Sequence, residues 1–157
     1  MNVWYVNSIL GTFRLEEEND AICGLALCPD GVPELEPLPR KVCETPLLQE
    51  AEEQLNEYFA GARREFDLPL APKGTPFQKA VWAEMCRIPY GETRTYGQLA
   101  AAVGKPKASR AVGGACHCNP IAILQPCHRV VGSTGRLTGY AYGVEMKQYL
   151  LELEQQE

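Results

Sequence analysis

A segment rich in proline and glycine near the middle of the chain limits most strongly how this sequence can fold. Residues 61–76 contain three prolines and two glycines, a composition typical of linkers. The charge changes sign there, because residues 1–72 hold 5 Lys/Arg against 14 Asp/Glu whereas residues 73–130 hold 8 against 2. We therefore predict two domains, residues 1–72 and residues 73–157.

The charge of residues 73–130 favours a polyanionic partner. Their excess of six positive charges contrasts with a net charge of -5 for the whole chain. Lysine and arginine side chains in this number can neutralise several phosphates and steer a nucleic acid toward one face. A solvated surface without a ligand is the alternative that charge alone leaves open.

The apolar patterns predict an α+β protein. Alternation over residues 3–28, broken by Leu10-Gly11 and Asn19-Asp20, indicates short antiparallel strands. Helical spacing over residues 47–59, ended by Gly61, completes a small α/β domain of sheet plus helix. No run approaches the roughly 18 to 20 apolar residues of a membrane span, and the N-terminus lacks the basic start of a signal peptide.

The second domain is predicted to be mostly helical. Thr75 is a suitable N-cap for a helix that begins at Pro76. Helices are predicted over residues 95–102 and 107–116, joined through Gly104 as in a helix-turn-helix, with a last helix over residues 146–153. Residues 121–124 are predicted to be an apolar strand before Cys127, and residues 139–143 a loop.

The second helix of this pair contains an unusual pair of glycines. Gly113 and Gly114 each cost about 1 kcal/mol relative to alanine inside a helix. With Ala108, Ala111 and Ala115 they leave a surface almost free of side chains. Such a surface permits close approach of a backbone, either that of another helix or that of a nucleic acid.

Cys127 and His128 place a thiol directly beside an imidazole in a segment that is otherwise apolar. A thiol attacks as a thiolate, and His128 or Arg129 could stabilise or generate that anion. On an extended strand the two side chains point to opposite faces, so coupling requires a bend or a bridging water. A structural cysteine beside a surface histidine is the alternative.

The other cysteines favour neither disulfides nor a metal. Seven cysteines at irregular spacings suit a reducing cytoplasm better than a disulfide framework. Cys116-His117-Cys118 is too closely spaced for a zinc site. The remaining N-terminal cysteines match no ligand pattern, so we predict no metal and no cofactor; they are Cys23, Cys28 and Cys43.

The order of several motifs resembles the O6-alkylguanine-DNA alkyltransferase family. The resemblance is strong over residues 74–154, whereas residues 1–72 agree only in layout. The motifs are Gly74-Thr75-Pro76-Phe77-Gln78, Val81-Trp82, Ile88-Pro89-Tyr90-Gly91, Thr95-Tyr96, Arg110-Ala111-Val112-Gly113, Asn119-Pro120 and Pro126-Cys127-His128-Arg129-Val130.

The resemblance implies a fold and a reaction. The fold is a ribonuclease-H-like N-terminal domain followed by a winged helix-turn-helix-like DNA-binding and active-site domain. The activity is that of a methylated-DNA–protein-cysteine methyltransferase, a monomer that binds double-stranded DNA through the minor groove and flips out O6-alkylguanine, with O4-methylthymine as a further candidate. The alkyl group passes irreversibly to Cys127 in a single turnover. A cytoplasmic protein follows, associated with the nucleoid in a bacterium and nuclear in a eukaryote.

The same resemblance implies roles for individual residues. Cys127 is the acceptor, His128 takes its proton through a water, Glu154 orients the imidazole, and Tyr96 donates a proton to the leaving guanine. Arg129 keeps a structural role. DNA-binding residues are Arg110, which fills the gap left by the flipped base, together with Thr95, Ala111, Gly113, Gly114, Ala115 and Asn119. The substrate pocket is formed by Pro126, Val130, Tyr140, Ala141 and Tyr142.

Two positions depart from the family pattern. Gln125 stands where an apolar residue is common. Tyr142 stands where a glycine is usual, and this implies a narrower substrate pocket and slower repair of bulky adducts than of methyl.

Two other functions remain open. A non-enzymatic binder of alkylated DNA on the same scaffold is one alternative. A helix-turn-helix regulator with a redox-sensing cysteine is the other.

Overall fold

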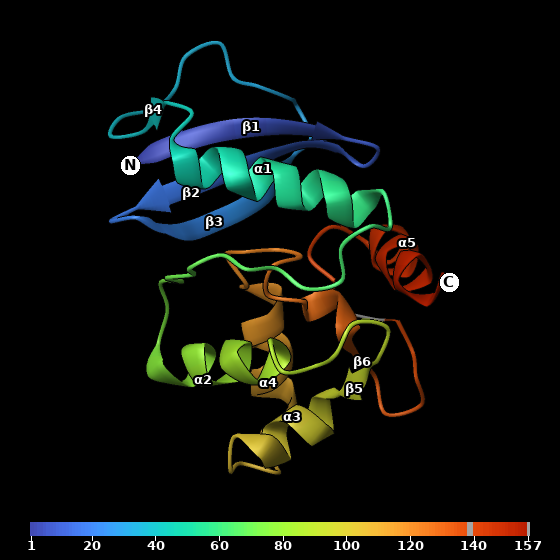
Figure 1. The fold of residues 1–157 in the computed structure, drawn as a ribbon. Helices are drawn as coiled ribbons and strands as arrows, with labels where there is room; N and C mark the ends of the chain where they lie inside the picture. The colour runs from blue at the N-terminus through green and yellow to red at the C-terminus, as the bar shows by residue number, and fades with distance from the viewer. Residues whose placement is uncertain (138–139, 157) are drawn as a thin grey trace. The chain divides into compact units, whose positions relative to one another are not determined.

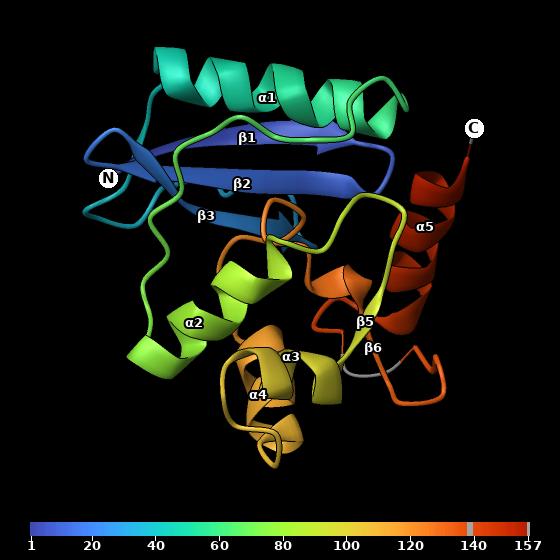
Figure 2. The same ribbon diagram turned by 60° about the horizontal axis from the view of Figure 1, so that its bottom comes forward.

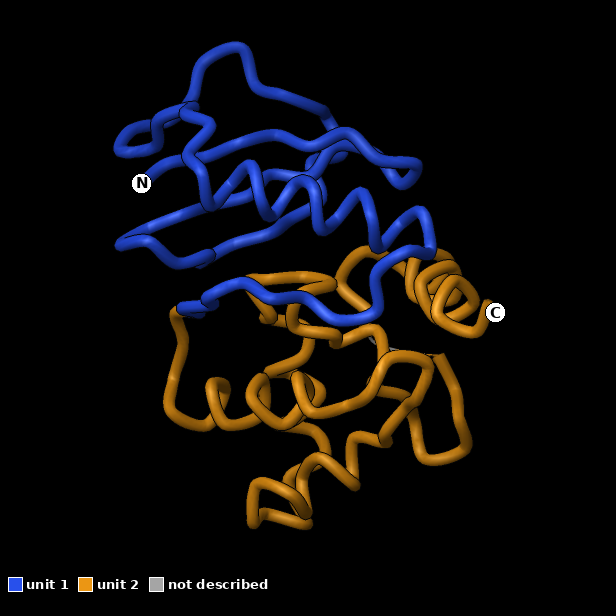
Figure 3. The backbone as a smooth tube through the Cα atoms, in the orientation of Figure 1, with its two compact units in different colours: residues 1–72 blue, residues 73–157 orange. Residues whose placement is uncertain are grey.

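The computed structural model describes residues 1–137 and 140–156. It separates into two compact units, Met1–Pro72 and Lys73–Glu157 (Figure 3). Gly139, where the predicted loop of residues 139–143 begins, lies outside the described residues.

Unit 1 is built on a four-stranded sheet of order β3-β2-β1-β4 (Figure 1). Strands β1 (Asn2–Ser8), β2 (Gly11–Glu18) and β3 (Ala21–Cys28) are antiparallel, which confirms the strands predicted from the alternation. Asn19 and Asp20 both have positive φ, the conformation that a two-residue hairpin turn requires. The two-residue strand β4 (Lys41–Val42) runs parallel to β1 and was not predicted, because it is too short to show an alternation.

Helix α1 (Pro46–Phe59) lies along this sheet in Figure 2 and starts at the N-cap Thr45. Its buried face includes Leu48, Leu55 and Tyr58, which pack as the apolar spacing predicts. The segment after the helix is not a free linker, because the Gln54 side chain holds the backbone N–H and carbonyl of Asp67. Leu70 then forms a parallel bridge with Ile22 in β3.

Unit 2 contains helices α2 (Pro76–Met85), α3 (Tyr96–Ala102), α4 (Ser109–His117) and α5 (Val144–Gln155). Capping boxes formed by Thr75 with Gln78 and by Thr95 with Gln98 start the first two. Trp82 is fully buried, and its indole N–H donates to the Ala115 carbonyl at 2.8 Å. Helix α4 begins two residues later than predicted, because residues 105–108 form a turn.

The connection from α4 to the reactive cysteine differs from the prediction. Residues 121–124 form buried turns rather than a strand, and Ile123 has φ of 68°. Cys127–Arg129 form a 3₁₀ turn, η1, instead of an extended segment. Strand β6 (Val130–Val131) then pairs in parallel with β5 (Arg94–Thr95), which brings the start of α3 beside the end of η1.

None of the helices in the described part of the chain combines the length and apolar character needed to cross a membrane.

Candidate active site

Cys127 lies at the start of η1 and is only 5% exposed. The side-chain amide of Asn119 donates to its sulfur at 3.2 Å. The bend of the 3₁₀ turn replaces the extended geometry in which the side chains of Cys127 and His128 would point to opposite faces. The local backbone therefore allows the coupling of thiol and imidazole that an extended segment would hinder.

The surroundings of Cys127 favour a protonated thiol at rest. Burial raises the pKa of the Cys127 thiol, while the hydrogen bond from Asn119 and the charge of Lys147 oppose that rise. Lys147, on α5, is 1% exposed, and burial lowers the pKa of its amine. A proton acceptor is therefore needed before Cys127 can attack as a thiolate.

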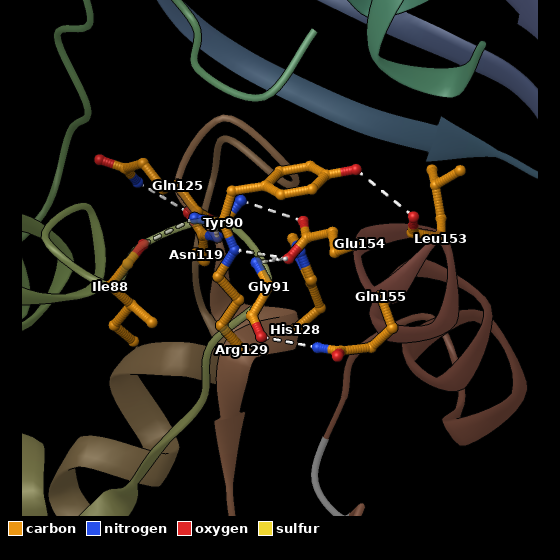
Figure 4. Close-up of polar contacts among 10 residues, drawn as sticks. All are labelled: Ile88, Tyr90, Gly91, Asn119, Gln125, His128, Arg129, Leu153, Glu154 and Gln155. Carbon is orange, nitrogen blue, oxygen red and sulfur yellow. Dashed lines mark hydrogen bonds and ion pairs between the residues drawn. The ribbon is translucent and has the colours of Figure 1, made fainter. Parts of the chain in front are cut away.

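His128 is positioned by a buried ionic network (Figure 4). Its Nε2 lies 2.7 Å from Oε2 of Glu154 in α5, and both side chains are fully buried. Arg129 binds the same carboxylate with two nitrogens, Nε to Oε1 at 2.8 Å and Nη2 to Oε2 at 3.0 Å. Its Nη1 donates to the Ile88 carbonyl at 2.7 Å.

The network fixes the charges of its members. Hydrogen bonds from His128 and Arg129 outweigh burial and hold the pKa of Glu154 at about 2, so the carboxylate is ionised. Burial lowers the pKa of His128, and the Arg129 guanidinium already balances the carboxylate. His128 is therefore neutral, with its proton on Nε2 facing Glu154. Within the described residues its Nδ1 has no hydrogen-bond partner, so this lone pair can accept a proton.

The end of α5 is tied to the loop after α2. Tyr90 donates its hydroxyl hydrogen to the Leu153 carbonyl at 3.4 Å, and Gln155 donates to the Gly91 carbonyl at 2.6 Å (Figure 4). The Arg129 guanidinium also lies 5.8 Å from the centre of the Tyr90 ring. These contacts fix the helix turn that carries Glu154.

Tyr96 begins α3, beside the same part of the site. The amine of Lys147 lies 5.8 Å from the centre of its ring. Thr95, predicted to bind DNA, is the N-cap of this helix, and its hydroxyl accepts from the backbone N–H of Gln98 at 3.0 Å. The parallel pairing of Thr95 with Val131 holds Tyr96 close to the Cys127 segment.

The predicted DNA-binding helix α4 has one bare face. Arg110, Ala111 and Gly114 are exposed and Gly113 is half-buried, whereas Ala115 is 2% exposed and belongs to the core. A Cβ atom on Gly114 would meet nothing within 4 Å, and one on Gly113 would meet only an ordinary contact at 4.0 Å. Packing inside the protein therefore does not explain these glycines.

The predicted pocket residues differ in their exposure. Pro126 and Val130 are buried on either side of η1, whereas Ala141 is exposed. Tyr140 is buried, and within the described residues its hydroxyl has no hydrogen-bond partner. Burial, followed by the neighbouring Cys127, raises the pKa of Tyr140. Tyr142 packs edge-on against Tyr140 with ring centres 5.8 Å apart.

Over residues 1–137 and 140–156, no three histidine, cysteine, aspartate or glutamate side chains gather as a metal site. Cys116 is buried against Met85, whereas His117 and Cys118 are exposed. The absence of a metal stays a prediction.

Comparison with known proteins identifies the family. The family model for the DNA-binding domain of 6-O-methylguanine DNA methyltransferase matches residues 76–156, and that for its ribonuclease-like domain matches residues 3–72. The chain is 49% identical over 148 residues to the constitutive methylated-DNA–protein-cysteine methyltransferase of Bacillus subtilis, covering 92% of this chain and 90% of that protein. The chain belongs to the 6-O-methylguanine DNA methyltransferase family.

Other members of the family agree with this assignment. The methylated-DNA–protein-cysteine methyltransferase of Methanosarcina barkeri is 60% identical over 107 residues, which is 68% of each chain. The crystal structure of Mycobacterium tuberculosis OGT in complex with DNA superposes with a TM-score of 0.89 at 41% identity, covering 99% of this chain and 93% of that one. The family and the two-part α+β fold predicted from the motifs are confirmed.

Two buried polar residues of the site in this family member were not among the predicted ones. Lys147 lies on an otherwise amphipathic helix, where a lysine usually faces solvent. Gln125 is 3% exposed and was noted only as a departure from an apolar position. In the sequence, the departure at Gln125 was the only available signal, because no pattern distinguishes a buried lysine from a surface one.

We expect Glu154→Gln to destabilise unit 2 by about 3 to 5 kcal/mol at neutral pH, because Arg129 keeps a buried charge without its partner. The depressed pKa of Glu154 contributes stability that is complete above its ordinary value of 4.5 and is lost as the pH falls toward 2. Urea unfolding between pH 7 and pH 3 measures both effects. The exposed Glu152→Gln in the same helix is the control, and an equal loss in both variants would contradict the role of the network.

We expect Lys147→Met to slow the reaction of Cys127 with iodoacetamide about three- to tenfold at neutral pH, because the positive charge that favours the thiolate is lost. The pH at which the rate reaches half its maximum should rise accordingly. Mass spectrometry of the Cys127 peptide gives the rate. Lys105→Met, at an exposed position, serves as the control; an unchanged pH profile in Lys147→Met would refute the electrostatic effect.

Proposed function

We propose that this protein repairs alkylated DNA by direct reversal, moving the alkyl group of O6-alkylguanine onto Cys127. Family membership supports the reaction. The observation that carries the assignment to this residue is the buried Cys127 beside a neutral His128, whose tautomer Glu154 and Arg129 fix. O6-methylguanine is the principal substrate, and the protein acts as a monomer.

Double-stranded DNA binds along the bare face of α4, which enters the minor groove. Arg110 is exposed at the start of this helix and fills the space of the flipped base. Gly113 and Gly114 let the helix approach the DNA backbone closely, which accounts for two glycines that packing within the protein does not require. Ala115 is buried, so it supports this face from below rather than contacting DNA.

Proton removal precedes the transfer. Nδ1 of His128 takes the thiol proton through a bridging water, and the Glu154 carboxylate, which Arg129 holds in place, stabilises the resulting imidazolium. The Asn119 amide and the Lys147 charge stabilise the thiolate.

The thiolate then displaces guanine at the alkyl carbon. The bond from sulfur to carbon forms as the bond from carbon to O6 breaks, and guanine takes a proton from the Tyr96 hydroxyl, which solvent later restores. The product at Cys127 is a thioether that water does not cleave, so each molecule reacts once. The hydroxyl of Tyr140, which has no hydrogen-bond partner among residues 1–137 and 140–156, supplies a polar contact to the flipped base. Slower repair of bulky adducts because of Tyr142 remains a prediction.

The transfer itself is tested with a duplex oligonucleotide containing O6-methylguanine. We expect the Cys127 peptide to gain one methylene by mass spectrometry, saturating at one group per protein. Cys127→Ala should still bind the duplex without taking up the group. No gain at Cys127, or transfer that continues past one equivalent, would rule out this mechanism. A redox regulator or a non-enzymatic binder would show no transfer at all.

The bare face of α4 gives a second prediction. Gly113→Ala and Gly114→Ala should each stabilise the protein by about 1 kcal/mol, because both positions have room for a Cβ atom. The same methyl groups should weaken binding to duplex DNA at least about fivefold through steric conflict. Urea unfolding and fluorescence anisotropy measure the two effects.

Asn56→Ala on the exposed face of α1 is the matched control. It raises helix propensity and therefore stability, but it should leave DNA affinity unchanged. If both glycine variants gain stability and bind DNA as well as the wild type, α4 does not approach DNA closely.

A further inference from the structure

We propose that Gln125 is a positioning residue for the alkyl transfer, because its side chain holds the Asn119 amide in the orientation that donates to the Cys127 sulfur. The proposal rests on the proposed function, in which Cys127 is the acceptor. It concerns a residue that departs from the apolar side chain common at this position. Figure 4 shows Gln125 and Asn119 side by side.

The contact between the two amides is short and buried. Nε2 of Gln125 donates to Oδ1 of Asn119 at 2.7 Å, and Gln125 is 3% exposed. A side-chain amide in so buried a position is compatible with a stable fold only if its hydrogen bonds are made. The position is therefore occupied by a donor aimed at Asn119, not by a polar side chain that happens to reach solvent.

Backbone contacts distinguish the oxygen Oδ1 of the Asn119 side-chain amide from its nitrogen Nδ2. Its Oδ1 accepts from the Ile121 N–H at 3.0 Å, and its Nδ2 donates to the Gln125 carbonyl at 2.8 Å. The remaining lone pair of Oδ1 takes the Gln125 side chain, and the remaining hydrogen of Nδ2 takes the Cys127 sulfur. All four hydrogen-bonding positions of the Asn119 amide are then used.

The complete hydrogen bonding of the Asn119 amide favours ionisation of Cys127. As Cys127 loses its proton, the bond from Asn119 to the sulfur becomes charge-assisted and strengthens. The donor from Gln125 polarises the Asn119 amide further and opposes rotation of that amide, which would turn Oδ1 toward the thiolate. An apolar residue at position 125 would leave one lone pair of Asn119 Oδ1 without a donor. It would neither polarise the Asn119 amide nor oppose its rotation.

A role in packing alone predicts a different behaviour. If Gln125 only fills space, its replacement by a side chain of the same length changes stability without changing how the reaction depends on pH. If Gln125 acts through Asn119, the replacement lowers the thiolate fraction of Cys127. The defect is then largest at neutral pH and disappears at high pH, where every Cys127 is ionised.

The test compares Gln125→Met with the wild type and with Leu124→Met, a neighbouring buried apolar position. Iodoacetamide, which forms a carbon–sulfur bond with release of iodide, is the probe, and mass spectrometry follows the Cys127 peptide from pH 6 upward to the pH at which the rate reaches its plateau. We expect Gln125→Met to react about fivefold more slowly at neutral pH, the effect of one hydrogen bond. Its pH midpoint should rise by about 0.7 unit. Leu124→Met should follow the wild-type profile.

An Asn119→Ala background isolates the route of the effect. There, Gln125→Met should cause no further slowing, because the group through which Gln125 acts is gone. Slowing of the same size in that background, or slowing that is equal at all pH values, would overturn the proposal. Should Gln125→Met fail to fold by urea titration, Gln125→Leu removes the same donor, and we expect the same loss of about fivefold at neutral pH.

A parallel assay with an oligonucleotide containing O6-methylguanine separates this proposal from the proposed function. Normal iodoacetamide profiles without transfer from the oligonucleotide in the wild type would reject Cys127 as the alkyl acceptor. In that case the iodoacetamide profiles of Gln125→Met and the wild type could still be compared, because they do not depend on transfer from the oligonucleotide. Transfer in the wild type together with identical profiles in all variants would reject only the role of Gln125.

Discussion

The buried carboxylate of Glu154 is the interaction on which the arrangement of the site depends. It receives Arg129 and His128 from consecutive positions of one 3₁₀ turn, and it projects from the C-terminal half of α5. The same guanidinium reaches the Ile88 carbonyl in the loop after α2. One anion therefore joins three segments that are distant in the sequence. Removing it leaves a buried cation and a buried imidazole without their shared partner.

This network also sets the chemical character of the cysteine. Because Arg129 neutralises Glu154, His128 gains nothing by carrying a second positive charge and stays a base. Cys127 is buried and keeps its proton at rest, although Asn119 and Lys147 lie ready to stabilise the anion. A buried, protonated thiol reacts with oxidants and alkylating agents more slowly than an exposed thiolate does.

The sequence predicted the regular elements better than the turns of the site. Periodic apolar residues and the N-cap Thr75 located the helices to within two residues. The turns over residues 121–124 were read as a strand, because Ile123 is β-branched and its positive φ contradicts its intrinsic preference. The burial of Lys147 follows from tertiary contacts around Cys127, which no local pattern encodes. The motifs named the family, but they did not show how Arg129 and Gln125 hold the site.

Two kinds of constraint therefore act within unit 2. Around Cys127 the side chains of Asn119, Gln125 and Arg129 have hydrogen-bond partners inside the protein, and these contacts hold the irregular backbone. On α4 the reverse holds, since Gly113 and Gly114 reduce helix stability and nothing in the surrounding protein requires them. Because no contact inside the described protein accounts for this loss of helix stability, we infer that contact with a binding partner does. For this reason we propose that the backbone of bound DNA lies close to this face of α4.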